Sequence, residues 1–334
     1  MEYAEFQLKL AKFFAEVISP LPKPEWATKH KTTLSLDNSL LLDFSETKSD
    51  NPVFIIPPQA GHHSCIADYD LNQSLVEASL KAGKETYAAE WKSANYNQRN
   101  NSIDDCIISM KKCIDKIGKK VSLVGLCQGG WQSAIYTALY PEDVSSLVLA
   151  AAPIDFHEGN GMITQYAKLY PIEFYQSLVA MGYGNLNGGF MVMGFKMMNP
   201  VDRFITDYID LFEHIDDETF VKRARKFRGW YEYTQNLPGR FYLQVVKELF
   251  KENRLVKGSL NILGRNVDMQ NIACPLRLIA GEKDDITLPE QVFAAENYVS
   301  SKDITKIIVP AGHIGVFMGT KIVRDCWPGI FNSI

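Results

Sequence analysis

The sequence predicts an α/β fold in which helices flank a mostly parallel sheet. Short apolar runs recur along the chain, segments with helical periodicity separate most of them, and several runs end directly in glycine-containing turns. Strands that alternate with helices are typical of βαβ units, whose strands run parallel. The chain of 334 residues is also long enough to bury a sizeable core.

Composition excludes several classes of protein. The formal net charge of −4 and the lack of a basic tract give no electrostatic reason to expect a nucleic-acid partner. No run approaches the roughly 18 apolar residues of a membrane-spanning helix. The opening stretch, MEYAEFQLKL, carries acids where a signal peptide needs bases. We therefore expect a cytoplasmic protein without a transmembrane segment.

The cysteines are scattered along the chain and form no C-x-x-C pair. This spacing predicts neither a disulfide framework nor a zinc site, and it favours a reducing cytoplasm. We expect no metal and no cofactor. The six cysteines are Cys65, Cys106, Cys113, Cys127, Cys274 and Cys326.

The first 24 residues are expected to form an N-terminal helix that stops at a proline-rich stretch. One apolar stripe recurs there at helical spacing beside charged positions. Its members are Phe6, Leu10, Phe13, Phe14 and Val17. Such a stripe usually packs on its own domain, and contact with a granule or membrane surface is the alternative.

A hairpin and then a central strand follow. Residues 32–36 and 40–44 flank Asp37-Asn38 and predict two antiparallel strands. Residues 53–56 form a continuous apolar run, which is typical of a buried parallel strand. This strand delivers residues 57–63, PPQAGHH, to the carboxyl edge of the sheet, where loops build ligand sites in such folds.

The next elements continue the alternation. Residues 70–82 have a helical pattern that stops at a glycine, and residues 86–91 predict the next strand. Ser102 is expected to cap a helix that runs to Ile117, because Asp105 completes an S-x-x-D start.

The stretch VSLVGLCQGGW, residues 121–131, carries the strongest chemical signal. An apolar strand leads into Gly-Leu-Cys-Gln-Gly, and a helix is predicted to follow over residues 131–139. Cys127 therefore lies at a strand-to-helix corner. That is the nucleophile elbow G-x-S-x-G with cysteine in the serine position. Gly125 and Gly129 leave room for a strained turn, and the helix start favours a thiolate, the nucleophilic form. A tight turn with a buried, inert thiol is the alternative.

A nucleophile at such a corner needs an oxyanion hole. We expect the backbone N–H of Gln128 to be one donor and an N–H near Gln59 or Ala60 to be the second. His62 and His63 are adjacent, so they point in different directions. Loop structure or substrate contact suits them better than catalysis, and no further ligands at metal-binding spacing accompany them.

After a strand predicted at residues 144–151, the alternation of strands and helices stops. Residues 157–268 are aromatic and helical without clear strands, and residues 188–198 are rich in methionine, which suits an adaptable apolar surface. We expect this segment to be a cap inserted over the active site, since long insertions at loops are tolerated. A helical core filled by methionine is the alternative. Residues 1–156 and 269–334 then form the core domain.

Two late strands, predicted at residues 275–280 and 304–309, end beside an acid and a histidine. Asp284 and Asp285 follow the first strand, and His313 follows the second. The order nucleophile, acid, histidine is that of α/β hydrolases, so the predicted class is an α/β-hydrolase fold. The histidine is expected to act as base for the elbow cysteine, and either aspartate can hold its imidazole.

Nearly the whole chain resembles the group of polyhydroxyalkanoate synthases and intracellular polyhydroxyalkanoate depolymerases, which are α/β hydrolases with a cysteine nucleophile. The resemblance implies Cys127 as nucleophile, His313 as base and Asp284 as acid, because Asp284 matches the first residue of the synthases' Asp-His pair. The stretches that carry it are residues 125–130 (GLCQGG), 237–246 (LPGRFYLQVV), 253–255 (NRL), 263–268 (LGRNVD) and 312–315 (GHIG).

Three departures from the family pattern bear on the reaction. Residues 284–287, DDIT, and residues 58–62, PQAGH, are closer to the depolymerase branch. Gly129-Gly130 is the synthase-like form, where intracellular depolymerases tend to have proline. We therefore expect a depolymerase or esterase that hydrolyses polyesters or oligoesters of 3-hydroxy acids through a thioester on Cys127. The alternatives are a synthase-like acyltransferase that uses 3-hydroxyacyl-CoA, and an inactive granule-associated protein.

The same reasoning gives further expectations about contacts. His62, His63, Trp131 and Asp285 are candidates for substrate contact. The resemblance also implies attachment to the surface of polyhydroxyalkanoate granules in the cytoplasm, and it makes a homodimer an expectation.

Overall fold

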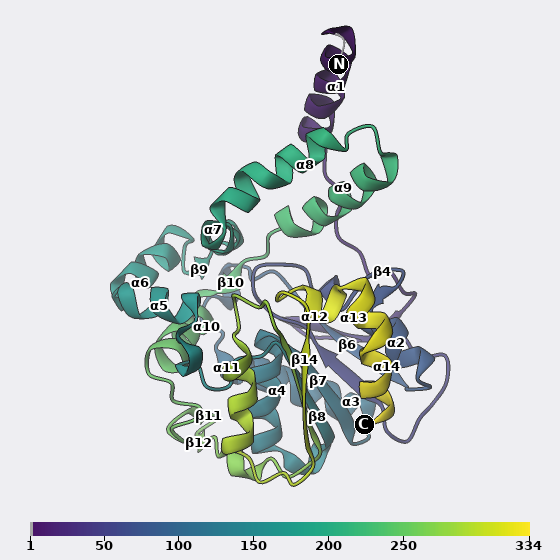
Figure 1. Ribbon diagram of the computed structural model, residues 1–334. Coiled ribbons are helices and arrows are strands. Elements are labelled where there is room, and N and C mark those ends of the chain that lie inside the picture. The colour runs from purple at the N-terminus through teal and green to yellow at the C-terminus, as the bar shows by residue number, and fades with distance from the viewer. Residues whose placement is uncertain (1–2) are drawn as a thin grey trace.

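The computed structural model describes residues 3–334, and Figure 1 shows a central sheet with helices on both faces and a helical segment beyond one end. Met1 and Glu2, part of the predicted N-terminal segment, lie outside the described residues. The eight-stranded sheet has the order β1-β2-β6-β3-β7-β8-β13-β14. Strands β1, β2 and β6 pair antiparallel, and all strands from β6 to β14 in this order pair parallel.

The strands of the main sheet are β1 (Lys31–Ser35), β2 (Ser39–Asp43), β3 (Val53–Ile56), β6 (Thr86–Trp91), β7 (Val121–Leu126), β8 (Val144–Ala150), β13 (Leu276–Gly281) and β14 (Ile304–Val309). Shorter strands pair outside it: β4 (Asp68–Asp70) with β5 (Gln73–Ser74), β9 (Asn185–Leu186) with β10 (Leu237–Pro238), and β11 (Asn261–Ile262) with β12 (Arg265–Asn266).

The α-helices are α1 (Tyr3–Ile18), α2 (Leu75–Lys81), α3 (Ile103–Ile117), α4 (Gln128–Leu139), α5 (Met162–Leu169), α6 (Ile172–Met181), α7 (Gly188–Met198), α8 (Asp207–Glu213), α9 (Glu218–Glu232), α10 (Gly239–Gln244), α11 (Pro289–Phe293), α12 (Gly315–Met318), α13 (Thr320–Asp325) and α14 (Trp327–Asn332). Two π-helical turns, Asp202–Thr206 and Val245–Lys251, precede α8 and follow α10.

Helices on both faces bury the centre of the sheet. Every residue of β3, β7 and β13 is buried. One core cluster joins the sheet to α3 and α4, and a second joins its other face to α2 and α12 to α14. Burying one Val, Leu, Ile or Phe side chain contributes about 1.5–3 kcal/mol, so these continuous apolar runs are suited only to a doubly covered sheet.

The structure confirms most of the elements predicted from the sequence. The expected antiparallel hairpin is β1 and β2, and the apolar runs at 53–56, 86–91, 144–151 and 304–309 are the strands β3, β6, β8 and β14. The cap of α3 forms as predicted, because the Asp105 carboxylate accepts a hydrogen bond of 2.7 Å from the Ser102 N–H.

The helix predicted at residues 70–82 is wrong in its first part. Residues 68–74 form the β4–β5 pair instead, with Asn72 turning at a φ of +62°, and α2 begins only at Leu75. Ser74 fixes that start, because its hydroxyl accepts a hydrogen bond of 2.8 Å from the Glu77 N–H. An N-cap residue has an extended backbone, so the helix cannot extend upstream through Ser74.

Residues 157–268 fold mainly as the helices α5 to α10, between β8 and β13. The sequence predicts no clear strands in this segment, and the structure adds two short pairs there, β9 with β10 and β11 with β12, in which each strand is two residues long. In Figure 1 the helices α7, α8 and α9 lie beyond the upper end of the sheet, and α1 stands at their far tip.

Helix α1 packs on this helical segment rather than on the sheet. The Phe13 ring meets Phe212 edge to face at 5.6 Å, and the Arg225 guanidinium donates hydrogen bonds of 2.8 and 2.6 Å to the Glu16 carboxylate. Part of the predicted apolar stripe is left uncovered, since Phe14 is 55% exposed. No helix among residues 3–334 combines the length and apolar character needed to cross a membrane.

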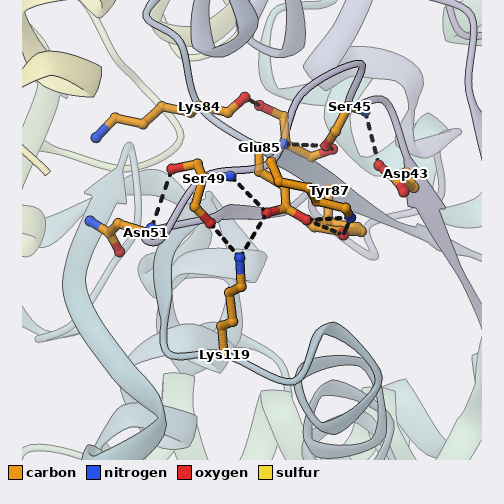
Figure 2. A network of polar contacts seen from close by, with 10 residues as sticks. Asp43, Ser45, Ser49, Asn51, Lys84, Glu85, Tyr87 and Lys119 are labelled. Atoms are coloured by element: carbon orange, nitrogen blue, oxygen red, sulfur yellow. Dashed lines mark hydrogen bonds and ion pairs between the residues drawn. The ribbon is translucent and has the colours of Figure 1, made fainter.

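Figure 2 shows a polar network around the buried carboxylate of Glu85, the residue that precedes β6. Glu85 is 2% exposed and accepts hydrogen bonds from Lys48 Nζ at 2.6 Å, from the Tyr87 hydroxyl at 2.7 Å and from the Ser49 N–H at 3.0 Å. Lys119 Nζ lies 3.4 Å away. Burial alone would raise the pKa of the Glu85 carboxyl, but these partners, Lys48 foremost, lower it to about 2.

Replacing Glu85 by glutamine is expected to lower the free energy of unfolding by about 1–3 kcal/mol at neutral pH, because two lysines and a buried tyrosine lose a charged acceptor. The lowered pKa of Glu85 stabilises the fold above about pH 4.5 and this contribution is lost as the pH falls toward 2. Denaturant unfolding at a series of pH values measures the difference.

The matched control is Glu142→Gln, which changes an exposed carboxylate in the same way. If Glu85→Gln were no less stable than this control at pH 7, the network would make no contribution to the free energy of unfolding.

Candidate active site

Cys127 occupies the corner between β7 and α4 in a backbone conformation that residues other than glycine rarely adopt. Its φ is +50°. Two hydrogen bonds hold the turn: the Cys127 N–H donates to the Ala150 carbonyl, and the Gly130 N–H donates to the Cys127 carbonyl, each at 2.9 Å. A positive φ at a residue that is not glycine costs energy and persists only where its surroundings enforce it. Here β8 and the first turn of α4 do so.

The glycines around the cysteine allow neighbouring backbones to approach. A Cβ at Gly129 would lie 2.0 Å from the Ile56 carbonyl oxygen, and one at Gly125 would lie 2.4 Å from the Gly130 Cα. A Cβ at Gly130 would lie 2.1 Å from the Ala152 Cβ. None of these contacts can relax without moving a strand or the helix. Helix α4 starts at Gln128, three residues before the predicted start at Trp131.

The acid and the histidine come from the loops after β13 and β14. His313 Nδ1 lies 2.8 Å from Asp284 Oδ2, and the side chains are 9% and 0% exposed. The other carboxylate oxygen, Oδ1, accepts hydrogen bonds of 3.0 Å from the Ile286 N–H and 2.9 Å from the Thr287 N–H. Asp284 is thus fully buried, fully bonded and directed at the imidazole.

The charge of the histidine follows from its two neighbours. Burial works to lower the pKa of His313, but the Asp284 carboxylate, and after it the Cys127 sulfur, raise the pKa well above its ordinary value. The Cys127 side chain lines the same cavity as the ring. A ring that stays protonated beside the sulfur favours a thiolate–imidazolium pair, the reactive state of cysteine nucleophiles.

Asp285, the other aspartate considered from the sequence, does not contact the histidine ring. Its carboxylate accepts a hydrogen bond of 2.5 Å from the Asn199 side-chain amide, which lies just after α7. The chain turns at these residues, so one aspartate faces the imidazole and the next faces the helical segment.

Cys127 and His313 open into one cavity of about 380 Å³. Most of the sequence-predicted site residues line it: Ala60, His62, His63, Cys127, Gln128, Trp131, Asp285 and His313. Asp284 lies behind the imidazole. Gln59 does not line the cavity; its side-chain oxygen instead accepts a hydrogen bond of 3.4 Å from the Cys106 thiol.

The predicted oxyanion donors lie at the start of α4 and in the loop after β3. The first N–H groups of a helix have no intrahelical acceptor, so the Gln128 N–H at the start of α4 can face the cavity. Ala60 lines the cavity from the other loop. Such N–H groups near a nucleophile can bind a negatively charged oxygen.

The two adjacent histidines have different surroundings. His63 Nδ1 accepts a hydrogen bond of 3.2 Å from the Cys65 N–H, and its Nε2 lies 3.8 Å from Glu90. His62 stacks on Trp230 with ring centroids 4.6 Å apart. Burial, and then the charge of Lys196, lower the pKa of His62 to about 4, so its ring is neutral at physiological pH.

Residues of the helical segment complete the cavity wall, and sequence reasoning singled out few of them. They include Ile163, Phe195, Met198, Asn199, Arg203, Trp230, Tyr231 and Phe250. The methionine-rich stretch gave a signal for Phe195 and Met198. Trp230 and Tyr231 gave none, because an aromatic pair at the end of a basic helix is not distinguishable from ordinary packing. Within residues 3–334, no cluster of three or more His, Cys, Asp or Glu side chains could hold a metal ion.

The chain is similar to one described protein family and to several polymerase subunits. The family described as "Protein of unknown function (DUF3141)" matches residues 41–332. A poly(3-hydroxyalkanoate) polymerase subunit PhaC from Haloferax mediterranei is 29% identical over 86% of this chain and 59% of its own length. A PhaC polymerase subunit from Synechocystis is 29% identical over 79% of this chain and 72% of its own length. The resemblance inferred from the sequence is thereby confirmed on its synthase side.

The similarity to the Haloferax relative covers only part of that protein, and a separate comparison with solved structures concerns the fold. The chain spans about three fifths of the Haloferax relative, 59% of its length. Among solved structures, an epoxide hydrolase from Bacillus megaterium matches with a TM-score of 0.56 and 15% identity, covering 92% of this chain and 100% of that one. At such identity the match concerns the fold alone, and it confirms the predicted α/β-hydrolase fold.

The contact between Asp284 and the ring leads to a pH-dependent prediction. Since the carboxylate helps to keep His313 protonated, Asp284→Asn is expected to lower the pKa of His313 toward its ordinary value and to slow alkylation of Cys127 by iodoacetamide near pH 7 by about tenfold. Mass spectrometry of the Cys127 peptide across pH measures the rate.

Asp285→Asn is the matched control, because it removes the neighbouring carboxylate without touching the ring. It should leave the alkylation profile as in the wild type. Equal profiles for both variants and the wild type would contradict the role given to Asp284.

Proposed function

We propose that this chain, which belongs to the DUF3141 family, is an acyl-transferring enzyme with Cys127 as nucleophile, His313 as base and Asp284 as the acid that holds the histidine. The observation that carries the proposal is the single cavity where the elbow cysteine meets a histidine bonded at 2.8 Å to a buried carboxylate. A buried, fully bonded carboxylate behind such a ring serves to orient and charge the imidazole.

The favoured reaction is transfer of a 3-hydroxyacyl group from a thioester such as 3-hydroxyacyl-CoA to a hydroxyl acceptor. The Cys127 thiolate attacks the thioester carbonyl, and N–H groups near Gln128 and Ala60 stabilise the oxyanion. The carbonyl re-forms, the bond to the carrier sulfur breaks, and the protonated His313 gives its proton to the departing sulfur. The acyl group is then a thioester on Cys127.

The second step regenerates the enzyme. His313 removes the proton from the hydroxyl of the acceptor, whose oxygen attacks the acyl carbonyl on Cys127. The carbon–sulfur bond breaks, an ester forms, and Cys127 leaves as a thiolate beside the newly protonated imidazole. If the acceptor is a hydroxyacyl chain, each cycle lengthens a polyester by one unit.

Two observations favour transfer over the hydrolysis expected first from the sequence. The curated relatives are named as polymerase subunits. Position 130 is also suited to glycine, because its N–H donates to Cys127 and a Cβ there would meet Ala152 at 2.1 Å. The pair Gly129-Gly130 is the synthase-like form, where intracellular depolymerases tend to have proline.

Hydrolysis remains the second candidate function. The DDIT stretch after Asp284 and the PQAGH loop beside the cavity are the two features that favour it. The same three residues would act, with water in place of the hydroxyl acceptor.

Residues 157–268 are proposed to act as a cap. Phe195, Met198 and Tyr231 from this segment line the cavity over Cys127, so the acyl thioester would form among apolar side chains. An apolar chamber limits the access of water, which is what a transferase requires of an intermediate that water can hydrolyse.

The test is to incubate the full chain with 3-hydroxybutyryl-CoA and, separately, with 3-hydroxybutyrate oligomers, identifying the products. Release of CoA with formation of oligoester is expected. Cys127→Ala and His313→Ala should each reduce the rate at least about a thousandfold while the fold is retained, because Cys127 is the cysteine that lines the cavity and His313 is the histidine bonded to the buried Asp284.

The control is Cys326→Ser, which changes a cysteine outside the cavity and should leave turnover unaffected. Monomer release from oligomers without synthesis would favour the second candidate. Silence on both substrates, or full activity of Cys127→Ala, would contradict the proposal.

A further inference from the structure

His62 lies in an aromatic stack in the wall of the cavity that holds Cys127. Its ring centroid is 4.6 Å from Trp230, 4.9 Å from Tyr231 and 6.1 Å from Phe195. The loop that carries it is fixed from the helical segment, because the Gln235 N–H donates a hydrogen bond of 2.8 Å to the Gly61 carbonyl. The ring therefore has a defined position and orientation.

One nitrogen of this ring is unsatisfied. Nδ1 of His62 is buried and has no hydrogen-bond partner anywhere in residues 3–334. The Tyr231 backbone raises the pKa of the ring slightly, as a hydrogen-bond acceptor does, and we therefore place the ring proton on Nε2, the nitrogen that is not left unpartnered. Because burial keeps the ring neutral, Nδ1 carries a lone pair and can only accept a hydrogen bond.

His62 lines the cavity, but its Nδ1 has almost no accessible surface, so a ligand reaches this atom only when the side chains around the ring shift. Buried polar atoms are nearly always bonded, so an unsatisfied acceptor on a residue of the cavity wall indicates a ligand that donates. His63, the neighbouring histidine, already accepts the Cys65 N–H and has no such vacancy at Nδ1. In a thioester, the carbonyl of the acyl group offers only acceptors. The hydroxyl of a hydroxyacyl group is the one donor that the acyl part can present.

We propose that His62 determines specificity by accepting, at Nδ1, a hydrogen bond from the hydroxyl of the acyl group that is bound at Cys127. This inference rests on the proposed acyl transfer and assigns the selection of hydroxyacyl over unsubstituted acyl groups to one atom. A site built to bond a hydroxyl discriminates against the analogue that lacks it, because the buried acceptor then stays unpaired.

The experiment compares two thioesters of the same carrier, 3-hydroxybutyryl-CoA and butyryl-CoA. The rate at which each acylates Cys127 is measured by rapid quenching and mass spectrometry of the intact chain. The wild type is expected to react faster with the hydroxylated thioester by at least about tenfold. In His62→Phe, which keeps an aromatic ring in the stack but has no acceptor, the ratio should fall to near one.

Two further variants separate the acceptor from the packing. His62→Asn retains a side-chain oxygen close to the position of Nδ1 and should keep part of the ratio, even if the phenylalanine variant fails to fold. His214→Phe makes the same substitution at an exposed histidine of the helical segment, where the ring lies against Phe220, and should preserve the wild-type ratio.

The outcomes distinguish this inference from its premise. Equal acylation by both thioesters in the wild type, or a ratio unchanged in His62→Phe, would overturn the role of His62 and leave acyl transfer standing. No acylation of Cys127 by either thioester would overturn the proposed function, and the inference with it.

Discussion

The arrangement of the site depends on the need to satisfy one fully buried carboxylate. Asp284 has no exposed side-chain surface, and isolating its charge from water costs several kcal/mol unless each oxygen is bonded. Two N–H groups of its own loop satisfy Oδ1, so only Oδ2 is left for the His313 ring. The loops after β13 and β14 are joined through this contact, and the imidazole is held beside Cys127.

The sheet supplies the other half of that geometry. Because β7, β8, β13 and β14 run parallel, their carboxyl ends meet at one edge, which brings together side chains separated by almost two hundred positions. The glycines beside Cys127 let α4 approach β3, so the nucleophile stands where β7 ends. The helical segment then surrounds this edge with apolar side chains. In such surroundings an unpaired polar atom, such as Nδ1 of His62, selects a ligand that can bond to it.

Much of this was accessible from the sequence, for identifiable reasons. A buried parallel strand must be continuously apolar, so β3, β7 and β13 stand out as short runs, and the elbow needs glycine at fixed offsets from Cys127. The β4–β5 pair was missed because the left-handed turn at Asn72 interrupts a pattern that otherwise has helical spacing. The wall formed by Trp230 and Tyr231 was missed because only the tertiary path of a long insertion brings α9 over the cavity. The choice between Asp284 and Asp285 depended on the family resemblance, since spacing alone does not distinguish adjacent residues of a loop.

The central claim is that Cys127 and His313 share a proton as a thiolate–imidazolium pair, and ultraviolet absorbance of the thiolate measures this directly. The spectrum of Cys127→Ala is subtracted from that of the wild type across a pH series. The account predicts a thiolate signal from Cys127 that is already present at neutral pH and is absent there when the subtraction is repeated in a His313→Ala background. A signal that rises only above about pH 8, as for an unpaired thiol, and that is indifferent to His313, would contradict the account.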